Sequence, residues 1–156
     1  MNKFMCRRYL LFCVSLFVNA LGIAFITKAA LGTSPITSVT YVLSMFTPFT
    51  IGQWTILLNL LFVILELFLM TREDLKSDLR MYLLQIPISF SFGMFIDLCM
   101  HYILFWLNPV EYVYMIVALL IGCVILAVGI ALEVKANAAM MAGEYFVKVI
   151  TRRFRG

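Results

Sequence analysis

A carboxylate and an imidazole lie close together in an otherwise apolar stretch of the chain. Asp97 and His101 stand four residues apart in SFGMFIDLCMHYI, so a helix would place both side chains on one face. An ionisable group inside such an apolar run needs a partner, which makes Asp97 the strongest single candidate for function. It could share a proton relay with His101, coordinate a cation, or form a structural ion pair with Lys28 or Lys135. The sequence leaves transport and the structural ion pair equally open.

A helix start follows a glycine break in the segment GTSPIT at residues 32–37. Ser34 is a favoured N-cap, and Pro35 suits the first helical position. The N-terminus of a helix presents free N–H groups and about half a positive charge, so it can bind an anion or a polar group. Lys28 and Lys135 would add positive charge nearby. In the alternative interpretation, both lysines extend toward opposite membrane surfaces and the motif only caps a loop helix.

A second acidic residue, Glu144, lies in the segment MMAGEY at residues 140–145. Asn137 could cap a helix there, as Ser34 does in the first segment. The Glu144 carboxylate could bind a coupling ion, or it could pair with Lys148 one helical turn away, and the sequence favours neither. The residues expected to bind a substrate are therefore Lys28, Gly32, Thr33, Ser34, Thr37, Asp97, Lys135, Asn137 and Glu144.

Other polar residues in or near apolar runs are expected to hold helices together rather than to line a cavity. Interhelical hydrogen bonds of this kind contribute about 0.6–2 kcal/mol each. The residues concerned are Asn19, Gln53, Asn59, Glu66 and Gln85. The chain has one histidine and carries no nucleophile-elbow, zinc-protease or phosphate-loop motif. We therefore expect no enzyme, no catalytic residue, no cofactor and no metal.

The composition places these residues in a membrane protein. Hydrophobic residues make up 64% of the 156 residues and charged residues 13%, with a mean hydropathy of +1.04. A soluble domain of this size needs about a quarter of its residues charged, so a soluble enzyme and a disordered chain are both excluded. The net charge of +4 comes from lysines and arginines clustered beside apolar runs. That arrangement is typical of membrane-anchoring loops and not of a nucleic-acid-binding face.

Four apolar runs are long enough to cross a hydrocarbon core, which needs about 20 helical residues. They are Tyr9–Ile26, Ile51–Met70, Met81–Leu107 and Tyr112–Leu132. Continuous apolar runs without alternation predict helices and not barrel strands. The first run lacks a clear signal-peptidase site, so we expect it to be retained as a span. The expected fold is all-α: a polytopic membrane protein with a single membrane domain over residues 1–156.

Two further apolar stretches, Pro35–Thr47 and Ala138–Ile150, are too short to span. We expect both to be short re-entrant half-helices. The positive-inside rule supports this, because a re-entrant first segment brings all three basic clusters, at residues 3–8, 72–80 and 148–155, to the cytoplasmic side. Both termini are then cytoplasmic.

An internal repeat indicates how these segments are organised. GIAFITKA at residues 22–29 matches GIALEVKA at residues 129–136, 107 residues later. Each copy ends a span and precedes one of the short segments, and an odd number of crossings separates them. The pattern predicts an inverted-topology repeat, an organisation common in secondary transporters. The first repeat covers residues 9–107 and a partial second repeat covers 112–156, so either the chain is a fragment or a partner completes it.

Several of these motifs together resemble the YczE/YyaS/YitT group of bacterial integral membrane proteins. The pattern combines KAALGTSP at 28–35, Gly52, the Gly93-x-x-x-Asp97 spacing, and EVKA leading to MMAGE at 140–144. It covers essentially the whole chain, with Ala142 standing where the family pattern has proline. The resemblance implies a multi-pass protein of the bacterial inner (cytoplasmic) membrane. Its members are commonly described as hypothetical proteins or transporters and continue for about two more spans.

The leading functional hypothesis is a small-solute transporter whose two half-helix starts, near Ser34 and Asn137, meet at the bilayer midplane. Asp97 and Glu144 would offer ion or proton coupling. The alternative is a non-transporting subunit that assembles with or regulates another membrane complex. A transporter should gather polar residues around one cavity, whereas a subunit should expose a wide apolar or small-residue face and close Asp97 in a bridge. The expected partners are membrane lipid, a small polar or anionic solute and, as an option, further copies in a homo-oligomer; nucleic acid is not expected.

Overall fold

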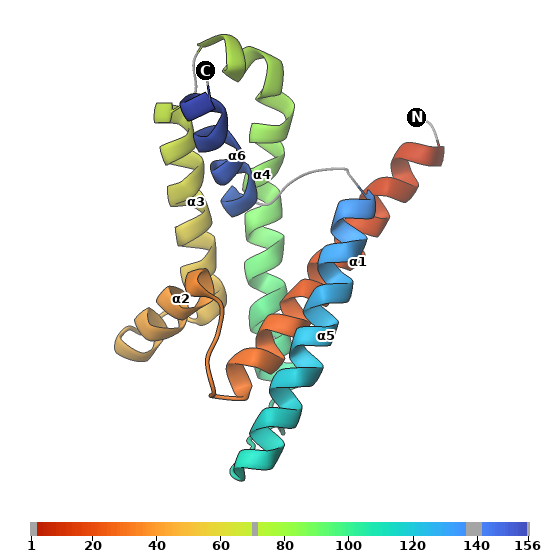
Figure 1. The fold of residues 1–156 in the computed structure, drawn as a ribbon, viewed down its shortest axis with the longest axis vertical. Coiled ribbons are helices and arrows are strands. Elements are labelled where there is room, and N and C mark those ends of the chain that lie inside the picture. The colour runs from red at the N-terminus through yellow and green to blue at the C-terminus, as the bar shows by residue number, and fades with distance from the viewer. Residues whose placement is uncertain (1–2, 70–71, 137–141, 156) are drawn as a thin grey trace.

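The computed structural model of the protein describes residues 3–69, 72–136 and 142–155, most of which are helical (Figure 1). Four of the helices are long and apolar enough to cross a membrane, over Arg7–Lys28, Ile51–Leu69, Tyr82–Ile103 and Tyr112–Ala136. Within these ranges, the prediction of an all-α fold with four candidate membrane spans is thereby confirmed. The elements are α1 (Lys3–Lys28), α2 (Pro35–Phe46), α3 (Ile51–Leu69), α4 (Arg72–Leu98), the π-helical turn η1 (Cys99–Ile103), α5 (Tyr112–Ala136) and α6 (Ala142–Arg155).

Some helix bounds differ from those that the sequence predicts. The third predicted span begins at Met81, but α4 already begins at Arg72, within the charged stretch that precedes the span. Glutamate, leucine, lysine and arginine are strong helix formers, so the helix extends beyond the apolar run. At its other end α4 passes into η1, and residues 104–111 are not helical. The second short segment begins as a helix at Ala142; residues 138–141 of the predicted segment lie outside the described residues.

The antiparallel helices α1 and α5 pack with their backbones in close contact at three glycines. A β-carbon on Gly22 would lie 2.8 Å from the backbone nitrogen of Leu126, and one on Gly129 would lie 2.9 Å from that of Asn19. A β-carbon on Gly122 would lie 2.7 Å from a side-chain carbon of Ile26. These distances are too short for any larger residue, as at other membrane helix contacts built on small residues.

The second antiparallel pair, α3 and α4, also meets at glycines. A β-carbon on Gly52 would overlap the carbonyl oxygen of Gly93, and one on Gly93 would lie 2.6 Å from the carbonyl oxygen of Gly52. The short helices α2 and α6 both pack against α3. The rings of Phe62 on α3 and Phe146 on α6 stack with centroids 5.2 Å apart.

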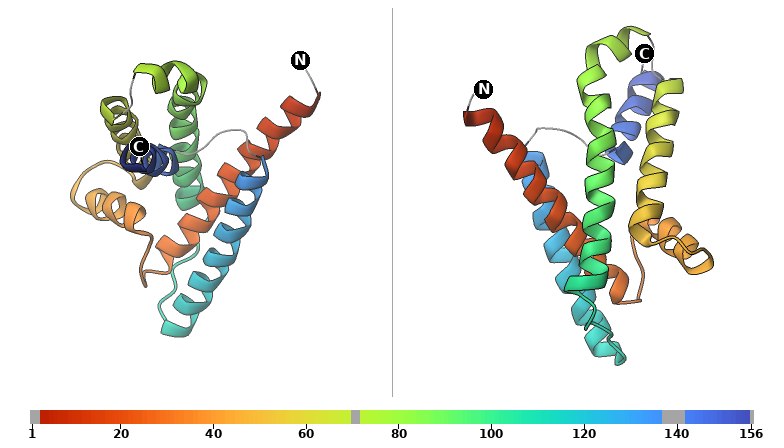
Figure 2. Two further views of the ribbon diagram at one scale, coloured as in Figure 1. Left: turned by 45° about the horizontal axis from the view of Figure 1, so that its top comes forward. Right: turned by 180° about the vertical axis from the view of Figure 1, so that it is seen from behind.

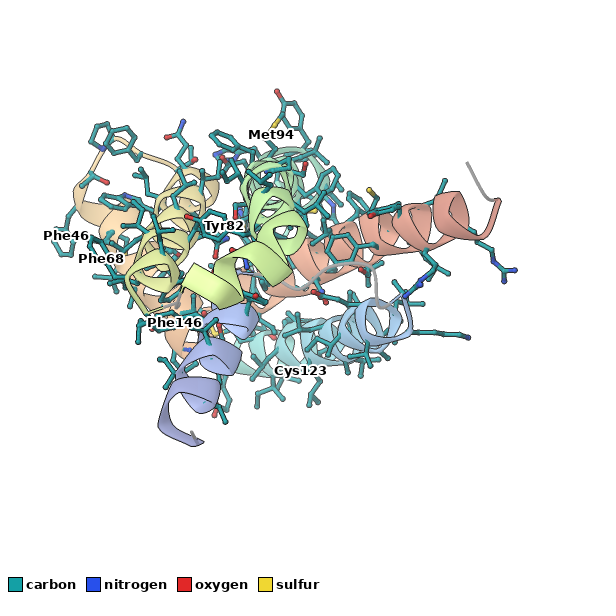
Figure 3. The ribbon with its side chains drawn as sticks, turned by 90° about the horizontal axis from the view of Figure 1, so that it is seen from above. Phe46, Phe68, Tyr82, Met94, Cys123 and Phe146 are labelled. Atoms are coloured by element: carbon teal, nitrogen blue, oxygen red, sulfur yellow. The ribbon has the colours of Figure 1, made fainter. Side chains whose placement is uncertain are left out.

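The two pairs meet where α4 packs against α1. Phe17 on α1 and Phe95 on α4 make an edge-to-face contact with ring centroids 5.7 Å apart. An apolar core of buried side chains continues this contact, including Phe12, Phe92 and Ile96. Many other large apolar side chains point away from the bundle, as the labelled Phe46, Phe68 and Met94 do in Figure 3. An outward-facing apolar surface of this extent suits contact with lipid.

The views in Figures 1 and 2 show how the chain runs between the two ends of the molecule. The start of α1, the end of α3, the start of α4 and the end of α6 lie at one end. The connection from α1 to α2 and the start of α5 lie at the other end. Helices α2 and α6 both begin well inside the length of the molecule, so their first turns stand beside the middle of the longer helices.

Candidate functional site

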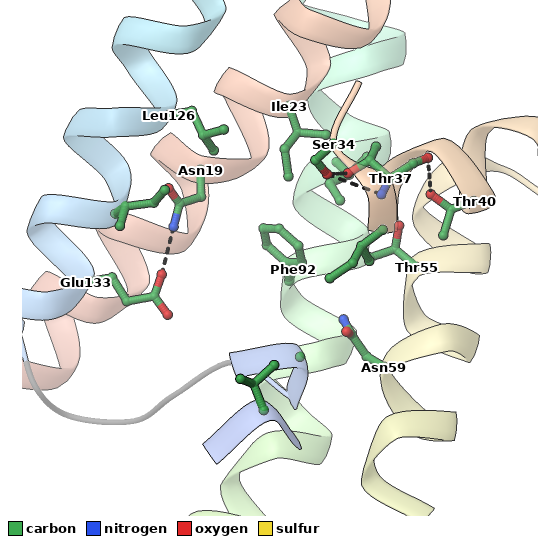
Figure 4. Close-up of a pocket in the computed structure, with 15 residues that line it drawn as sticks. Asn19, Ile23, Ser34, Thr37, Thr40, Thr55, Asn59, Phe92, Leu126 and Glu133 are labelled. Carbon is green, nitrogen blue, oxygen red and sulfur yellow. Dashed lines mark hydrogen bonds between the residues drawn. The ribbon is translucent and has the colours of Figure 1, made fainter. Parts of the chain in front are cut away.

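A cavity of about 400 Å³ lies between the two helix pairs and receives side chains from each of the helices α1–α6 (Figure 4). Apolar residues such as Ile23, Phe92 and Ile130 form much of its wall. The polar residues lining it are the hydroxyl-bearing Ser34, Thr37, Thr40 and Thr55, the amides Asn19 and Asn59, and the carboxylate Glu133. A mostly apolar pocket with a few converging polar groups is the usual form of a small-molecule site.

The first turn of α2 forms one side of this cavity. Ser34 is the N-cap, with φ −63° and ψ 154°, and its Oγ accepts a hydrogen bond from the Thr37 N–H at 3.3 Å. The hydroxyl groups of Ser34 and Thr37 also lie 2.9 Å apart in a hydrogen bond. Pro35 occupies the first helical position. The predicted helix start is therefore confirmed in both its capping residue and its proline.

The first turn of α6 lies next to that of α2. Gly143 lines the cavity, and a β-carbon on it would stand 3.5 Å from Cδ1 of Ile36. Glu144 is the third residue of α6, and its side chain is outside what the structure describes, as is the whole of Asn137. The described contact between the two short helices is therefore the one between Ile36 and Gly143.

A buried hydrogen bond joins α1 to α5 at the cavity wall. Nδ2 of Asn19 donates to Oε2 of Glu133 at 2.8 Å, and the two residues are 3% and 5% exposed. The Asn19 Oδ1 atom is buried and makes no hydrogen bond with the described residues. Sequence reasoning assigned Asn19 a structural role and gave Glu133 none. The available signal was that Asn19 is a polar residue in a predicted span and that Glu133 directly follows one, where such residues are costly.

Asp97 lies away from this cavity and joins α4 to the start of α3. Its Oδ2 accepts a hydrogen bond from the Thr50 hydroxyl at 2.6 Å, and its Oδ1 accepts one from the Gly52 N–H at 2.9 Å. The carboxylate therefore caps the N-terminus of α3 from a neighbouring helix, which electrostatics favours. His101 forms its hydrogen bond with the backbone of Asp97 and not with the carboxylate: its Nδ1 lies 3.1 Å from the Asp97 carbonyl oxygen.

The remaining predicted site residues lie in three places. Lys28 lines a second pocket of about 360 Å³ together with Asp97 and His101. Lys135 is exposed in the last turn of α5, and Gly32, with φ +145°, and Thr33 belong to the connection before α2. Ser34 and Thr37 are thus the predicted residues that the described structure brings to the central cavity.

Another buried polar pair lies between α3 and α4, outside both pockets. Glu66 and Gln85 are 0% and 1% exposed, and neither the carboxylate oxygens nor the amide atoms make a hydrogen bond of good geometry with the described residues. The nearby Tyr82 hydroxyl instead donates to the Val63 carbonyl oxygen at 3.3 Å. Glu66 therefore contributes a poorly satisfied polar group to the α3–α4 contact.

Four apolar spans around a partly polar cavity define a multi-pass α-helical membrane protein. The chain belongs to the family of unknown function DUF6198, whose model matches residues 6–156. No curated protein and no solved structure matches the chain.

Proposed function

We propose that this protein is a small-solute transporter of the bacterial cytoplasmic membrane and that the central cavity is its solute site. In this proposal the chain forms an inverted-topology repeat, in which α2 and α6 are re-entrant half-helices that begin near the bilayer midplane. The resemblance to the YczE/YyaS/YitT group agrees with the location and the architecture.

The observation that carries the proposal is that the repeat spacing pairs the residues lining the cavity. The sequence repeat offsets its two copies by 107 residues, and α2 and α6 begin at Pro35 and Ala142, which differ by the same 107. Residues separated by this spacing line the cavity together in four pairs: Asn19 with Leu126, Ile23 with Ile130, Ile36 with Gly143, and Thr40 with Val147. A pseudo-twofold axis through the cavity would produce such pairs.

The contacts between α1 and α5 support the same axis. Gly22 packs against Leu126, and Gly129 packs against Asn19. Each glycine of the repeat therefore meets the residue three positions before the other glycine. Exchanging the two copies maps one contact onto the other, which is the property of an interface with twofold symmetry.

The distribution of basic residues supports the proposed orientation. The start of α1, the start of α4 and the end of α6 lie at one end of the molecule (Figures 1 and 2). These segments contain the three clusters of lysine and arginine. The positive-inside rule assigns that end to the cytoplasm. The cavity and the first turns of α2 and α6 would then lie within the membrane, where secondary transporters bind their solutes.

The alternative function is a non-transporting membrane subunit, and the environment of Asp97 favours it. The carboxylate is held by Thr50 and by the Gly52 N–H, so it serves the contact between α3 and α4 rather than a solute. The outer face of α5, which includes Val124 and Val128, is widely exposed and could receive a partner. The two functions differ in whether solutes reach the central cavity.

Cysteine accessibility distinguishes them. Thr55→Cys is placed in a chain whose four native cysteines are changed to alanine, and an impermeant thiol reagent is added to right-side-out and inside-out membrane vesicles. A transporter should be labelled at residue 55 from both sides, because its cavity opens alternately to each. Labelling from neither side would support the subunit, and labelling from one side alone would indicate a blind pocket and contradict transport.

A further inference from the structure

We propose that Glu66 and Gln85 form a proton-binding site inside the contact between α3 and α4. In this proposal Glu66 carries a proton while the two helices are packed together and releases it when water enters between them. The inference goes beyond the proposed function and is tested separately from it. In a transporter, the site would supply the proton whose movement is coupled to that of the solute.

The two side chains are enclosed by protein and poorly satisfied. Glu66 is 0% exposed and Gln85 is 1% exposed, and both lie outside the central cavity and the second pocket. The Gln85 amide is the group that interacts with the Glu66 carboxyl group. Even so, none of their four polar side-chain atoms makes a hydrogen bond of good geometry with the described residues. Buried groups of this kind are uncommon, because an unpaired polar group in the interior is costly.

The described side chains around Glu66 supply no positive charge. On α4 the titratable side chain beside it is Tyr82, whose hydroxyl donates to the Val63 carbonyl oxygen at 3.3 Å. On α6, which also packs against α3, the described titratable side chain is Tyr145, and α2 packs near the opposite end of α3 (Figure 1). The side chains of α4 and α6 outside the described part are those of Glu144, Lys148, residues 72–81 and residues 152–155. A buried carboxylate without a counter-charge is strongly unfavourable, so the neutral acid fits these surroundings.

A protonated Glu66 satisfies both side chains, whereas a charged one does not. A carboxylate only accepts hydrogen bonds, so it could pair with the Gln85 N–H but would leave the Gln85 oxygen unpaired. A carboxylic acid and a primary amide each carry one donor and one acceptor side by side. In the proposed pair the Glu66 O–H donates to Gln85 Oε1, and Gln85 Nε2 donates to the other Glu66 oxygen. The proton therefore completes a reciprocal pair between the two helices.

The position of the pair gives the proton a route to water. Glu66 lies one helical turn before the end of α3, whereas the close contact of Gly52 with Gly93 lies toward the opposite end of that helix. Pro87 stands inside α4, between Gln85 and this glycine contact. A proline within a helix removes one backbone hydrogen bond and allows a kink. The part of α4 before Pro87 can therefore bend while the glycine contact keeps the helices from sliding, and the acid then loses its proton to the entering water.

Infrared spectroscopy of the full chain in lipid vesicles tests the site. A protonated carboxyl group has a C=O stretching band above the amide I region, and a carboxylate has none there. Wild type is compared with Glu66→Gln, which keeps the shape but has no acid, and with Gln85→Leu, which keeps the acid but has no amide. Ser89→Ala is the matched control, because Ser89 is also buried on α4 and its hydroxyl donates to the Gln85 backbone carbonyl oxygen at 2.7 Å.

At neutral pH, wild type and Ser89→Ala should show an acid band that Glu66→Gln lacks. Gln85→Leu should move this band to higher frequency, because the acid C=O loses its hydrogen bond. The proposal is overturned if Glu66→Gln removes a carboxylate band instead, since Glu66 would then be charged. A band that disappears in Glu66→Gln but stays in place in Gln85→Leu would mean that the amide does not hold the acid, and would overturn the pair. If Glu66→Gln does not fold, the band position in Gln85→Leu decides.

The dependence of stability on pH provides a second measurement. A folded state that holds one more proton than the unfolded state becomes less stable as the pH rises, by up to about tenfold in the unfolding equilibrium constant per pH unit. When both proteins are unfolded with dodecyl sulfate in mixed micelles, wild type should therefore lose stability relative to Glu66→Gln as the pH is raised from mildly acidic to neutral values. A difference between the two proteins that is independent of pH, or that changes in favour of wild type, would show that Glu66 releases no proton on unfolding and would contradict the proposal.

Discussion

Helices α3 and α4 lie so close together at Gly52 that no larger residue fits there. The substitution Gly52→Ala tests this close packing. The added β-carbon would lie 2.5 Å from Cγ and 2.6 Å from Oδ2 of Asp97, and closer still to the Gly93 carbonyl oxygen. Ordinary carbon contacts need about 3.5–4.0 Å, so the helices must separate by about 1 Å. Overpacking of this kind costs about 1–3 kcal/mol. Alanine recovers at most about 1 kcal/mol as the better helix former, which leaves a net loss of about 1–2 kcal/mol.

Unfolding in mixed detergent micelles measures this loss. Wild type and Gly52→Ala are titrated with dodecyl sulfate while circular dichroism at 222 nm follows the helix content. The midpoint should move to a lower mole fraction of dodecyl sulfate. The control is Gly143→Ala, also near a helix start, where the nearest atom to the new β-carbon is Ile36 Cδ1 at 3.5 Å. That variant should be as stable as wild type or slightly more stable.

The reasoning would be refuted by a Gly52→Ala protein whose midpoint equals that of wild type. It would also be refuted if Gly143→Ala were destabilised to the same degree, because the loss would then come from glycine in general and not from close packing against Gly93 and Asp97.

Three other predictions concern topology, helix proximity and the buried acid. Impermeant reagents should label Ser77→Cys from the cytoplasm and Asn108→Cys from outside, and labelling of both from one side would overturn the proposed orientation. A short bifunctional thiol reagent should crosslink Ile36→Cys to Gly143→Cys within one chain, since these positions are in contact; failure in a folded protein that labels at each position would separate α2 from α6. Glu66→Gln should be at least as stable as wild type in the dodecyl sulfate titration, because the buried Glu66 carboxylate makes no hydrogen bond of good geometry with the described residues. A loss of stability above about 1 kcal/mol would contradict this, since it would mean that the charged form makes a favourable interaction.

Local signals in the sequence predict the spans and the first short helix. Hydropathy and length identify the four spans, because a membrane helix must satisfy its own backbone and present apolar side chains. Ser34 and Pro35 mark the start of α2 because capping and a fixed φ act within a few residues. The end of α4 is harder to place, since no local residue type announces the change to the π-helical turn η1.

The polar contacts of the site depend on register between distant segments, which composition does not encode. Asn19 and Glu133 are 114 residues apart and meet because the glycine contacts fix how α1 slides along α5. Asp97 was predicted to interact with His101, Lys28 or Lys135 from helix periodicity and charge. Its carboxylate instead accepts hydrogen bonds from Thr50 and the Gly52 N–H, which become neighbours only when α3 packs against α4.

The helices within each pair and the helices of different pairs are held together by different kinds of contact, which affects how the protein adapts to the thickness of its bilayer. The α1–α5 contact joins backbones at glycines, whereas the contact of α1 with α4 runs through apolar side chains such as Phe17 and Phe95. Close backbone contacts at glycines resist sliding, so the α1–α5 pair and the α3–α4 pair each act as a stiff unit. The apolar side chains between the two pairs can repack when one pair moves against the other. A thinner or thicker membrane is accommodated by tilting such units. We therefore expect the lipid chain length of the host membrane to change the width of the cavity between the two pairs.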